Sequence, residues 1–389
     1  MASFLCIAEE FKGSTFMSAL KAMGHKVFLL TTEKSRSEPW PLEVIDEIFT
    51  RPDTRDQPHN RQELVEGTAW LMRNHGLDRI VALDDFDVED AALLREEFRI
   101  PGMGQTTARH FRDKLAMRML AYEHGIPVPA FSPLFREQQV REFCGAHEGP
   151  WVIKPRSEAS AAGIRKVHSA DEAVQVFNEL GDRAYRFLIE AFAPGSVYHV
   201  DALVKESALV FVKSSAYVDP PLAIVQGGGL FQTRMLDQQS DEARELAALT
   251  EQVMKAFGMR FSASHTEFIR DASGRFLLLE TSSRVGGAYI SNMVEHATGV
   301  DLWAEWAKLE AAELNGLGYK APGDKGGYGA VTMRTVPVEH PDLSHYHSDV
   351  VKYTVKKRYH AGMVYGHADR ERVVAEQEAV AKRLAEEFG

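Results

Sequence analysis

Residues 276–287 read FLLLETSSRVGG, an apolar strand that is interrupted by one acidic residue, Glu280, and followed by Arg284 and a pair of glycines. Burying a carboxylate without a partner is unfavourable, because the charge loses its hydration and gains nothing in return. Glu280 therefore needs a cation close by, and the surrounding sequence has to indicate which cation that is.

The hairpin that contains this strand supplies a second carboxylate. Two segments, SHTEFIR (264–270) and RFLLLET (275–281), flank the turn sequence Asp-Ala-Ser-Gly. Glu267 then lies opposite Leu278 or, in a register moved by two residues, opposite Glu280; a shift of one residue is unfavourable because it turns every side chain over. Both registers put the two glutamates on one face, with Cβ atoms roughly 5–8 Å apart. Two such carboxylates repel each other unless a cation lies between them, and Mg²⁺ favours one or two carboxylates together with substrate phosphates.

Features that suit phosphate binding lie upstream. Lys154 ends the short strand PWVIKP (150–155), and the small side chains of the following loop, SEASAAG (157–163), let backbone N–H groups approach phosphate oxygens. Lys114 lies in a predicted helix over 112–125. The segment lacks GxxxxGK[ST], which excludes an ordinary P-loop.

Length and composition narrow the class of protein. A chain of 389 residues is expected to form two or three domains. Its 45 Lys and Arg against 56 Asp and Glu give a net charge of −11, which argues against nucleic acid or an anionic membrane as the main partner. Cys6 and Cys144 are too few for a disulfide framework, and we expect both to be buried or idle thiols. The acidic start is unlike a signal peptide and no apolar run approaches the roughly 20 residues of a membrane span, so a cytoplasmic location is expected.

The first hundred residues predict a small doubly wound domain. Strands are expected at 4–9, 26–32 and 79–83, alternating with helices that include 61–75 and 87–98. This alternation predicts a parallel sheet covered on both faces. The segment EEFKGST does not supply the GxGxxG of a dinucleotide site, which disfavours a nicotinamide oxidoreductase.

Taken in order, these motifs resemble the ATP-grasp superfamily over roughly residues 110–300: a lysine in a helix that ends in GIPVP, then VIKP with a small-residue loop, IEAFAPG, TEF, and LLET with an arginine behind it. HTEF with LETSSRVGG is most similar to the L-amino-acid (dipeptide) ligases, which share the pattern E-x-x-x-R-x-G-G. The related biotin carboxylases and purine-pathway enzymes carry E-x-N-x-R instead.

The resemblance implies an α/β fold of the ATP-grasp type (α+β), built from an N-terminal doubly wound parallel-sheet domain, a two-lobed ATP-grasp unit and a β-rich C-terminal extension. The implied segments are a Rossmann-like pre-ATP-grasp domain (1–110), a small lobe or lid (111–190), a large lobe (191–315) and an extension that packs on the large lobe (316–389).

The resemblance also implies roles for particular residues. The implied contacts with the nucleotide are made by Lys114, Lys154, Ser157, Ser160, Gly163 and His199, and by the hinge Glu190, Ala191, Phe192 and Ala193, which would hold adenine mainly through backbone groups. Metal ligands would be Glu267, Glu280 and Ser282, the last standing where relatives often have asparagine. The substrate side would consist of Arg284, Gly286, Gly287, Gly227 and Gly228, with Arg284 and Lys154 catalytic.

Besides Ser282, the sequence departs from the family pattern at two further places. The phosphate loop contains only one glycine, Gly163, and Val197 stands where many relatives have an acidic residue. His199 matches the position of a ribose-contacting histidine in biotin carboxylases, and an ordinary strand histidine is an equal alternative.

The implied function is an ATP-dependent carboxylate–amine ligase that forms an amide through an acyl phosphate and releases ADP and phosphate, acting on small-molecule, amino-acid-like substrates. ATP and Mg²⁺ are the implied cofactors, with a second ion and substitution by Mn²⁺ left open. The alternatives are a purine-pathway or carboxylase-type ATP-grasp enzyme and a non-catalytic nucleotide-binding module. Substrate identity, pathway and oligomeric state stay open, a homodimer being one option.

Two further features have alternative interpretations. The glycine run in QGGGLFQ (226–232) predicts either a plain turn or a lid that closes on substrate. His340, His345 and His347 lack carboxylate or cysteine partners at ligand spacing, so a solvated loop is favoured over a metal site there.

Overall fold

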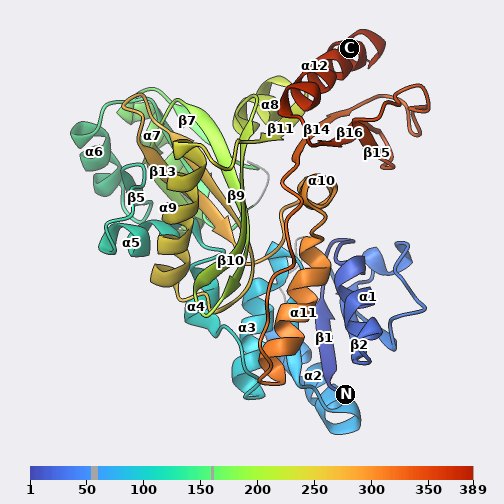
Figure 1. Cartoon of the computed structure of the whole chain (residues 1–389). Helices are drawn as coiled ribbons and strands as arrows, with labels where there is room; N and C mark the ends of the chain where they lie inside the picture. Colours follow the sequence, from blue (N-terminus) through green and yellow to red (C-terminus); the bar gives the residue numbers. More distant parts are fainter. Residues whose placement is uncertain (54–59, 159–161, 389) are drawn as a thin grey trace.

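The computed structural model of the protein describes residues 1–53, 60–158 and 162–388. Figure 1 shows the N-terminal domain and a small lobe beside a long central sheet, which the C-terminal strands extend. Ser160 lies outside the described residues, so its predicted contact with phosphate has no structural counterpart here.

The N-terminal domain is a four-stranded parallel sheet in the order β3-β2-β1-β4. Its strands are β1 (Ser3–Ile7), β2 (Lys26–Thr32), β3 (Glu47–Arg51) and β4 (Arg79–Ala82), and its helices are α1 (Ser14–Ala22), α2 (Arg61–His75), α3 (Val88–Glu97) and α4 (Gln105–Arg109). Alternate side chains of β1 enter two different cores, Phe4 and Cys6 on the side of α1, Leu5 and Ile7 on the side of α2 and α3. The predicted doubly wound domain is therefore present.

The small lobe is a four-stranded antiparallel sheet in the order β5-β8-β6-β7. Its strands are β5 (Phe131–Pro133), β6 (Trp151–Pro155), β7 (Arg165–Val167) and β8 (Phe187–Ala191), and its helices are α5 (Lys114–Glu123), α6 (Glu137–Ala146) and α7 (Ala170–Leu180). Cys144 lies in the core beneath this sheet, and both it and Cys6 are buried free thiols, as expected.

The central sheet has eight strands in the order β13-β12-β9-β10-β11-β14-β16-β15, joined by antiparallel pairings. Its strands are β9 (Ser196–Lys205), β10 (Ala208–Tyr217), β11 (Phe231–Met235), β12 (Phe261–Arg270), β13 (Phe276–Ser282), β14 (Tyr328–Thr335), β15 (Val351–Thr354) and β16 (His360–His367). Because β14 pairs with β11, the C-terminal strands extend the same sheet.

The remaining helices are α8 (Pro221–Gly227), α9 (Asp241–Phe257), α10 (Ile290–Thr298), α11 (Leu302–Leu314) and α12 (Arg370–Phe388), with short 3₁₀ turns at Ser35–Ser37, Asp85–Asp87 and Gly181–Arg186. Helix α11 lies against α1 of the N-terminal domain, where the rings of Phe16 and Trp306 stack edge to face with centroids 4.9 Å apart. The segment boundaries at 110, 190 and 315 stay predictions.

The register of the β12–β13 hairpin corrects one expectation. Near the turn, Arg270 pairs with Phe276 and Phe268 with Leu278, which is the one-residue shift that we expected to be unfavourable. A β-bulge then inserts Leu279, and beyond it Glu267 pairs with Glu280. The extra residue restores the in-and-out alternation within the hairpin, so the shift does not turn the glutamates over.

Candidate active site

The two glutamates face each other across β12 and β13, which decides between the two open registers in favour of Glu267 opposite Glu280. Each carboxylate has a protein partner: Tyr217 donates its hydroxyl to Glu267 Oε1 at 2.7 Å, and Lys114 Nζ lies 2.9 Å from Glu280 Oε2. Ser282 is two residues beyond Glu280 on the same strand and pairs with His265 in the ladder, so it lies on the glutamate face. These oxygens form a hard ligand set of the type that suits Mg²⁺.

Lys154 belongs to a buried group of three charges. Its Nζ lies 2.7 Å from Glu190 Oε2, and Arg118 donates from Nε to Glu190 Oε1 at 2.7 Å. Nη2 of Arg118 donates to the carbonyl of Leu279 at 2.6 Å, and its Nη1 is buried without a hydrogen-bond partner among the described residues. The sequence showed no evident partner for Lys154; the strand pairing of β6 with β8 supplies one.

Two cations share one carboxylate here, so the group carries a surplus positive charge. Burial, together with the charges of Arg118 and Lys114, lowers the pKa of Lys154 from its ordinary 10.5 to about 8, although Glu190 opposes the change. Burial favours the neutral form of Glu190 as well, but Arg118 and Lys154 hold its pKa below the ordinary value. Arg118 was not singled out from the sequence; its position four residues after Lys114 on one helix face was the available signal.

Lys114 stands in the first turn of α5, where Asp113 caps the helix by accepting from the N–H groups of Leu115 and Ala116. Its Nζ also donates to the carbonyl of Glu158 at 2.7 Å, next to Ser157 in the small-residue loop. At the other end of this loop Gly163 has φ +70°, a conformation that favours glycine. A Cβ at Gly163 would lie 3.0 Å from Pro155 Cγ, so this end of the loop lies beside the strand that carries Lys154.

The hinge uses two of its backbone donors inside the protein. The N–H of Ala191 donates to the carbonyl of Ala130 and that of Phe192 to the carbonyl of Pro150. Phe192 also lies under Lys166, whose Nζ is 3.8 Å from the ring centroid. Ala193 packs against a small apolar cluster that includes Tyr217 and Leu279, close to the two glutamates.

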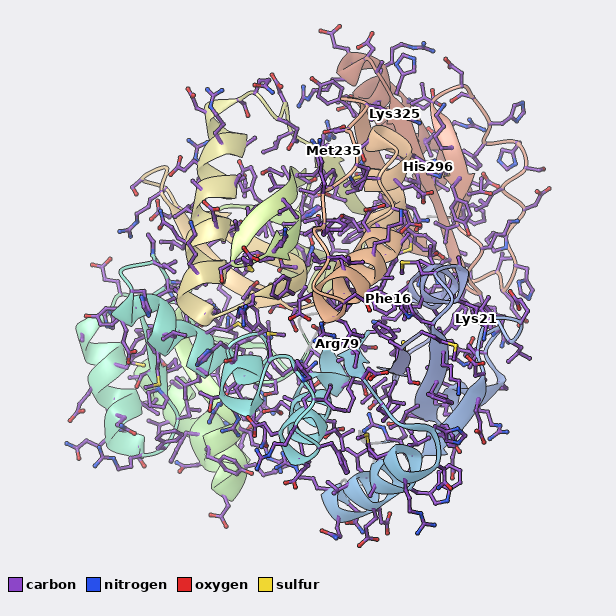
Figure 2. The ribbon with its side chains drawn as sticks, turned by 60° about the horizontal axis from the view of Figure 1, so that its bottom comes forward. Phe16, Lys21, Arg79, Met235, His296 and Lys325 are labelled. Carbon is purple, nitrogen blue, oxygen red and sulfur yellow. The ribbon has the colours of Figure 1, made fainter. Side chains whose placement is uncertain are left out.

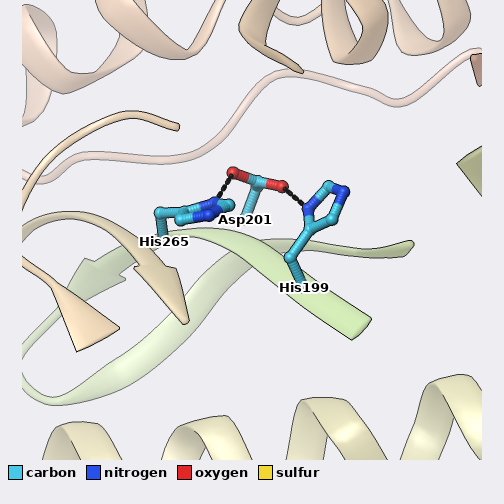
Figure 3. A group of neighbouring side chains, drawn as sticks. All are labelled: His199, Asp201 and His265. Carbon is cyan, nitrogen blue, oxygen red and sulfur yellow. Dashed lines mark hydrogen bonds and ion pairs between the residues drawn. The ribbon is translucent and has the colours of Figure 1, made fainter. Parts of the chain in front are cut away.

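A chain of buried polar groups runs from His199 to Glu267, and Figure 3 shows its central part. His199 donates from Nδ1 to one oxygen of Asp201 at 2.7 Å, and His265 donates from Nδ1 to the other at 2.9 Å. The Nε2 of His265 lies 3.6 Å from Glu267 Oε1, and the Nε2 of His199 contacts Thr233 Oγ1 at 2.6 Å. Both ring nitrogens of His199 therefore have protein partners here.

Charge pairing dominates this chain. Burial by itself disfavours the charged forms, but His265 and His199 hold the pKa of Asp201 well below its usual range, and Asp201 raises that of His265 to about 10. The three side chains also offer ligand atoms within 4.8 Å of one another, as a metal site would. The distances to Asp201 are those of hydrogen bonds, so we interpret the group as hydrogen-bonded around Asp201, with the His265 ring at ion-pair distance from Glu267.

Asp201 and His265 were not singled out from the sequence. The signal was present in HVD (199–201) and HTE (265–267), because residues two apart on a strand point to one face and the two strands are neighbours.

Arg284 joins the large lobe to the N-terminal domain. It donates from Nε to Asp85 Oδ2 at 2.8 Å, and from Nη2 to the same oxygen, while Nη1 donates to the carbonyl of Val285 at 2.8 Å. Burial favours the neutral form of Asp85, but the Arg284 charge and hydrogen bonds lower its pKa to about 2. A helix follows, since α10 begins at Ile290.

The glycines of the predicted substrate side differ in their surroundings. A Cβ at Gly286 would lie 2.6 Å from Asp201 Oδ1 and 2.9 Å from His265 Nδ1, whereas one at Gly287 would meet nothing within 4 Å. Gly286 is thus needed for the backbone to approach the buried pair. Gly227 and Gly228 are exposed at the end of α8, and the structure does not place them in contact with the glutamates.

The structure gives the three C-terminal histidines separate surroundings. His345 Nε2 lies 3.1 Å from Glu387 Oε2, His347 donates to the carbonyl of Ser344, and His340 is exposed.

Comparisons with known proteins agree with this architecture. No family model matches the chain. It is 26% identical over 268 residues to the L-arginine-specific L-amino acid ligase of Bacillus subtilis, covering 66% of this chain and 62% of that protein. It is 24% identical over 224 residues to the D-alanine–D-alanine ligase of Glaesserella parasuis serovar 5, covering 55% of this chain and 73% of that protein. The chain thus spans less than two thirds of the first of these relatives.

Solved structures of similar shape include an L-amino acid ligase from Bacillus licheniformis, with TM-score 0.73, 17% identity, and 100% of this chain and 98% of that chain covered. Another is the biotin carboxylase domain of the 2-oxoglutarate carboxylase of Hydrogenobacter thermophilus, which was solved with MgADP, ADP and bicarbonate. Its TM-score is 0.73 at 16% identity, and the match covers 100% of this chain and 90% of the carboxylase chain. The predicted ATP-grasp fold and the resemblance to that superfamily are confirmed, and the relatives named here are ligases and a carboxylase domain.

Across the described part of the chain, none of the helices has the length and apolar character needed to cross a bilayer.

Proposed function

We propose that this chain, which has the ATP-grasp fold, is an ATP-dependent carboxylate–amine ligase that joins amino-acid-like substrates through an acyl phosphate. The observation that carries the proposal is the surplus positive charge of the buried Arg118–Glu190–Lys154 group beside the facing Glu267 and Glu280. A buried net cation is unfavourable unless an anion compensates it, and a nucleotide phosphate would do so. The ligase names of the relatives agree with this choice.

The residues present fit ATP and Mg²⁺. Glu267 and Glu280 would hold the metal, with Ser282 on the same face, and Lys114 and Lys154 would bind phosphate oxygens. When bound, ATP supplies the phosphoryl group that activates the carboxylate, and Mg²⁺ neutralises charge on its phosphates. A structure similar in shape contains MgADP and ADP, which supports the same cofactors here. Whether one or two ions bind, and whether Mn²⁺ replaces Mg²⁺, are further parts of the proposal.

The protein's contribution to the reaction is mainly electrostatic. Lys154 and Lys114 would bind the phosphates as negative charge moves onto them, and donors that are held in place before the reaction contribute most of the rate enhancement in many enzymes. Arg284 would orient the substrate carboxylate with its planar guanidinium. The chain from Asp201 through His265 fixes the position of Glu267, so that this carboxylate needs no rearrangement to bind the metal.

The direct experiment measures ADP release with ATP and Mg²⁺ against a panel of amino acids, singly and in pairs. Amide formation requires release that depends on an amino acid and a new peptide mass in the product. Release that depends on bicarbonate alone would favour the carboxylase-type alternative. ATP binding without turnover of any substrate would favour a non-catalytic nucleotide-binding module. A homodimer and a cytoplasmic location remain predictions from the sequence.

A further inference from the structure

A cavity of about 230 Å³ lies between the N-terminal domain and the large lobe, away from the candidate active site. Its walls are β4, α3, the segment 101–107, the start of β12 and the face of α11 that carries Trp306, Glu310 and Glu313. None of the glutamates and lysines proposed to hold metal and phosphate lines it. A single water needs only roughly 15 Å³ by the same measure, so the cavity has room for a small molecule.

One wall of the cavity presents a buried cation. Arg95 on α3 is only 9% exposed, and it donates from Nε to the carbonyl of Met103 at 3.0 Å and from Nη1 to that of Ile80 at 2.9 Å. It forms no ion pair with any residue in the described ranges. Burial lowers its pKa to about 10, so that it still carries a positive charge at neutral pH. The charges of Glu310 and Glu96 act on Arg95 without a direct ion pair among the described residues, and a buried guanidinium in this position favours contact with an anion.

The loop around Arg95 is shaped to this side chain. A Cβ at Gly102, where φ is +146°, would lie 2.5 Å from Arg95 Cδ and 3.0 Å from its Nε. Glycine at this position therefore lets the loop close over the guanidinium. Pro101 and Gly102 are exposed, so the cavity reaches solvent at this rim.

A second wall of the cavity has the opposite charge. Glu310 and Glu313 lie three residues apart on α11, and both pair with Arg79, which Figure 2 shows at the boundary between the N-terminal domain and this helix. Trp306 also donates from Nε1 to Glu310 at 3.1 Å. At ion-pair distance two carboxylates share one arginine, so this wall has one more acidic group than basic groups. This wall is therefore short of positive charge.

We propose that the cavity binds a small aliphatic amino acid as an effector, with its carboxylate on Arg95 and its ammonium group on Glu310 and Glu313. The charges of the two walls match those of a zwitterion. Apolar lining supplied by Ile80, Val88 and Met103, with the rings of Phe261 and Trp306, suits an aliphatic side chain.

The cavity is connected to the candidate reaction centre at two points. Ser283 lines the cavity and directly precedes Arg284, and its carbonyl accepts from the Ser262 hydroxyl at 3.0 Å. Strand β4 runs from Arg79 in the cavity wall toward Asp85, the partner of Arg284. A ligand that fills the cavity would thus stabilise the packing that holds the Arg284–Asp85 pair, which gives it a route to the activity.

The test is calorimetric titration of the full chain, without ATP or metal, with L-leucine and two analogues: 4-methylpentanoate, which lacks the ammonium group, and 3-methylbutylamine, which lacks the carboxylate. We expect leucine to bind and each analogue to bind about tenfold more weakly or worse, because each loses one charged contact. Arg95→Gln should weaken leucine binding by about tenfold or more for the same reason.

Two variants keep the test decisive if Arg95→Gln does not fold. Thr107→Leu adds volume at a residue that lines the cavity, so it should block leucine. Arg284→Lys should keep leucine binding to within about fivefold, a change no larger than weak coupling through Ser283 would cause, since Arg284 does not line the cavity. The proposal is overturned if leucine does not bind by about 10 mM, if Thr107→Leu binds it as wild type does, or if only Arg284→Lys abolishes binding. The result is separable from the ligase proposal, because leucine bound at the substrate site would be lost in Arg284→Lys and kept in Thr107→Leu.

Discussion

Replacing Lys154 separates its function from its effect on stability. Lys154 is 4% exposed and shares Glu190 with Arg118. Its pKa falls from 10.5 to about 8 on folding. Since each tenfold change in proton affinity is worth about 1.4 kcal/mol, the charged lysine costs the nucleotide-free protein roughly 3 kcal/mol. Lys154→Met should therefore leave the free energy of unfolding unchanged or raise it, while the surplus charge that attracts phosphate is lost.

The pH dependence has a defined sign. Between pH 8 and 10.5 the unfolded chain binds more protons at this lysine than the folded protein does, so the stability of the wild type rises with pH in that window. The difference between wild type and Lys154→Met should accordingly shrink from pH 8 to pH 10.5.

The matched control is Glu190→Gln, which leaves Arg118 and Lys154 buried without their carboxylate. Removing the shared partner should cost about 3–5 kcal/mol, because an uncompensated buried charge remains. Urea unfolding measures the stabilities, and the increase in melting temperature on adding MgATP measures nucleotide binding. We expect Lys154→Met to lose most of that increase. If Lys154→Met is several kcal/mol less stable and still responds fully to MgATP, the lysine is structural and does not serve phosphate binding.

Three further predictions concern the metal and substrate side of the site. Glu280→Gln should lower turnover roughly 100-fold or more and weaken Mn²⁺ binding, measured by electron paramagnetic resonance in the presence of ATP. Unchanged Mn²⁺ binding would show that Glu280 is not a metal ligand. Arg284→Lys should also lose roughly 100-fold in rate, while ATP binding measured by calorimetry barely changes. An equal loss of rate in Asp85→Asn would mean that the loss comes from breaking the interdomain Arg284–Asp85 pair and not from a lost contact with the substrate carboxylate. Gly286→Ala should lower the free energy of unfolding by about 1–3 kcal/mol, because its Cβ would come within 2.6 Å of a buried carboxylate oxygen. The control is Gly287→Ala, whose Cβ would meet nothing within 4 Å. Equal stability of the two variants in urea would contradict the packing explanation.

Patterns that depend on local geometry could be predicted from the sequence. Glu267 and Glu280 share a face because side chains alternate along each strand and the Asp-Ala-Ser-Gly turn joins the two strands. The parallel N-terminal sheet followed from alternating strands and helices, which include the predicted helices over 61–75 and 87–98. These features depend on the spacing of a few neighbouring residues, which can be read directly from the sequence.

Contacts between distant segments were decided only by the tertiary structure. Glu190 reaches Lys154 because β8 pairs with β6, and Asp85 reaches Arg284 from 199 residues away across a domain boundary. The β-bulge at Leu279 and the link from Asp201 to His265 likewise depend on which strands become neighbours. The sequence does not identify the partner of a buried cation, because many carboxylates are chemically suitable for it. Only the burial of the apolar faces brings one of them within reach.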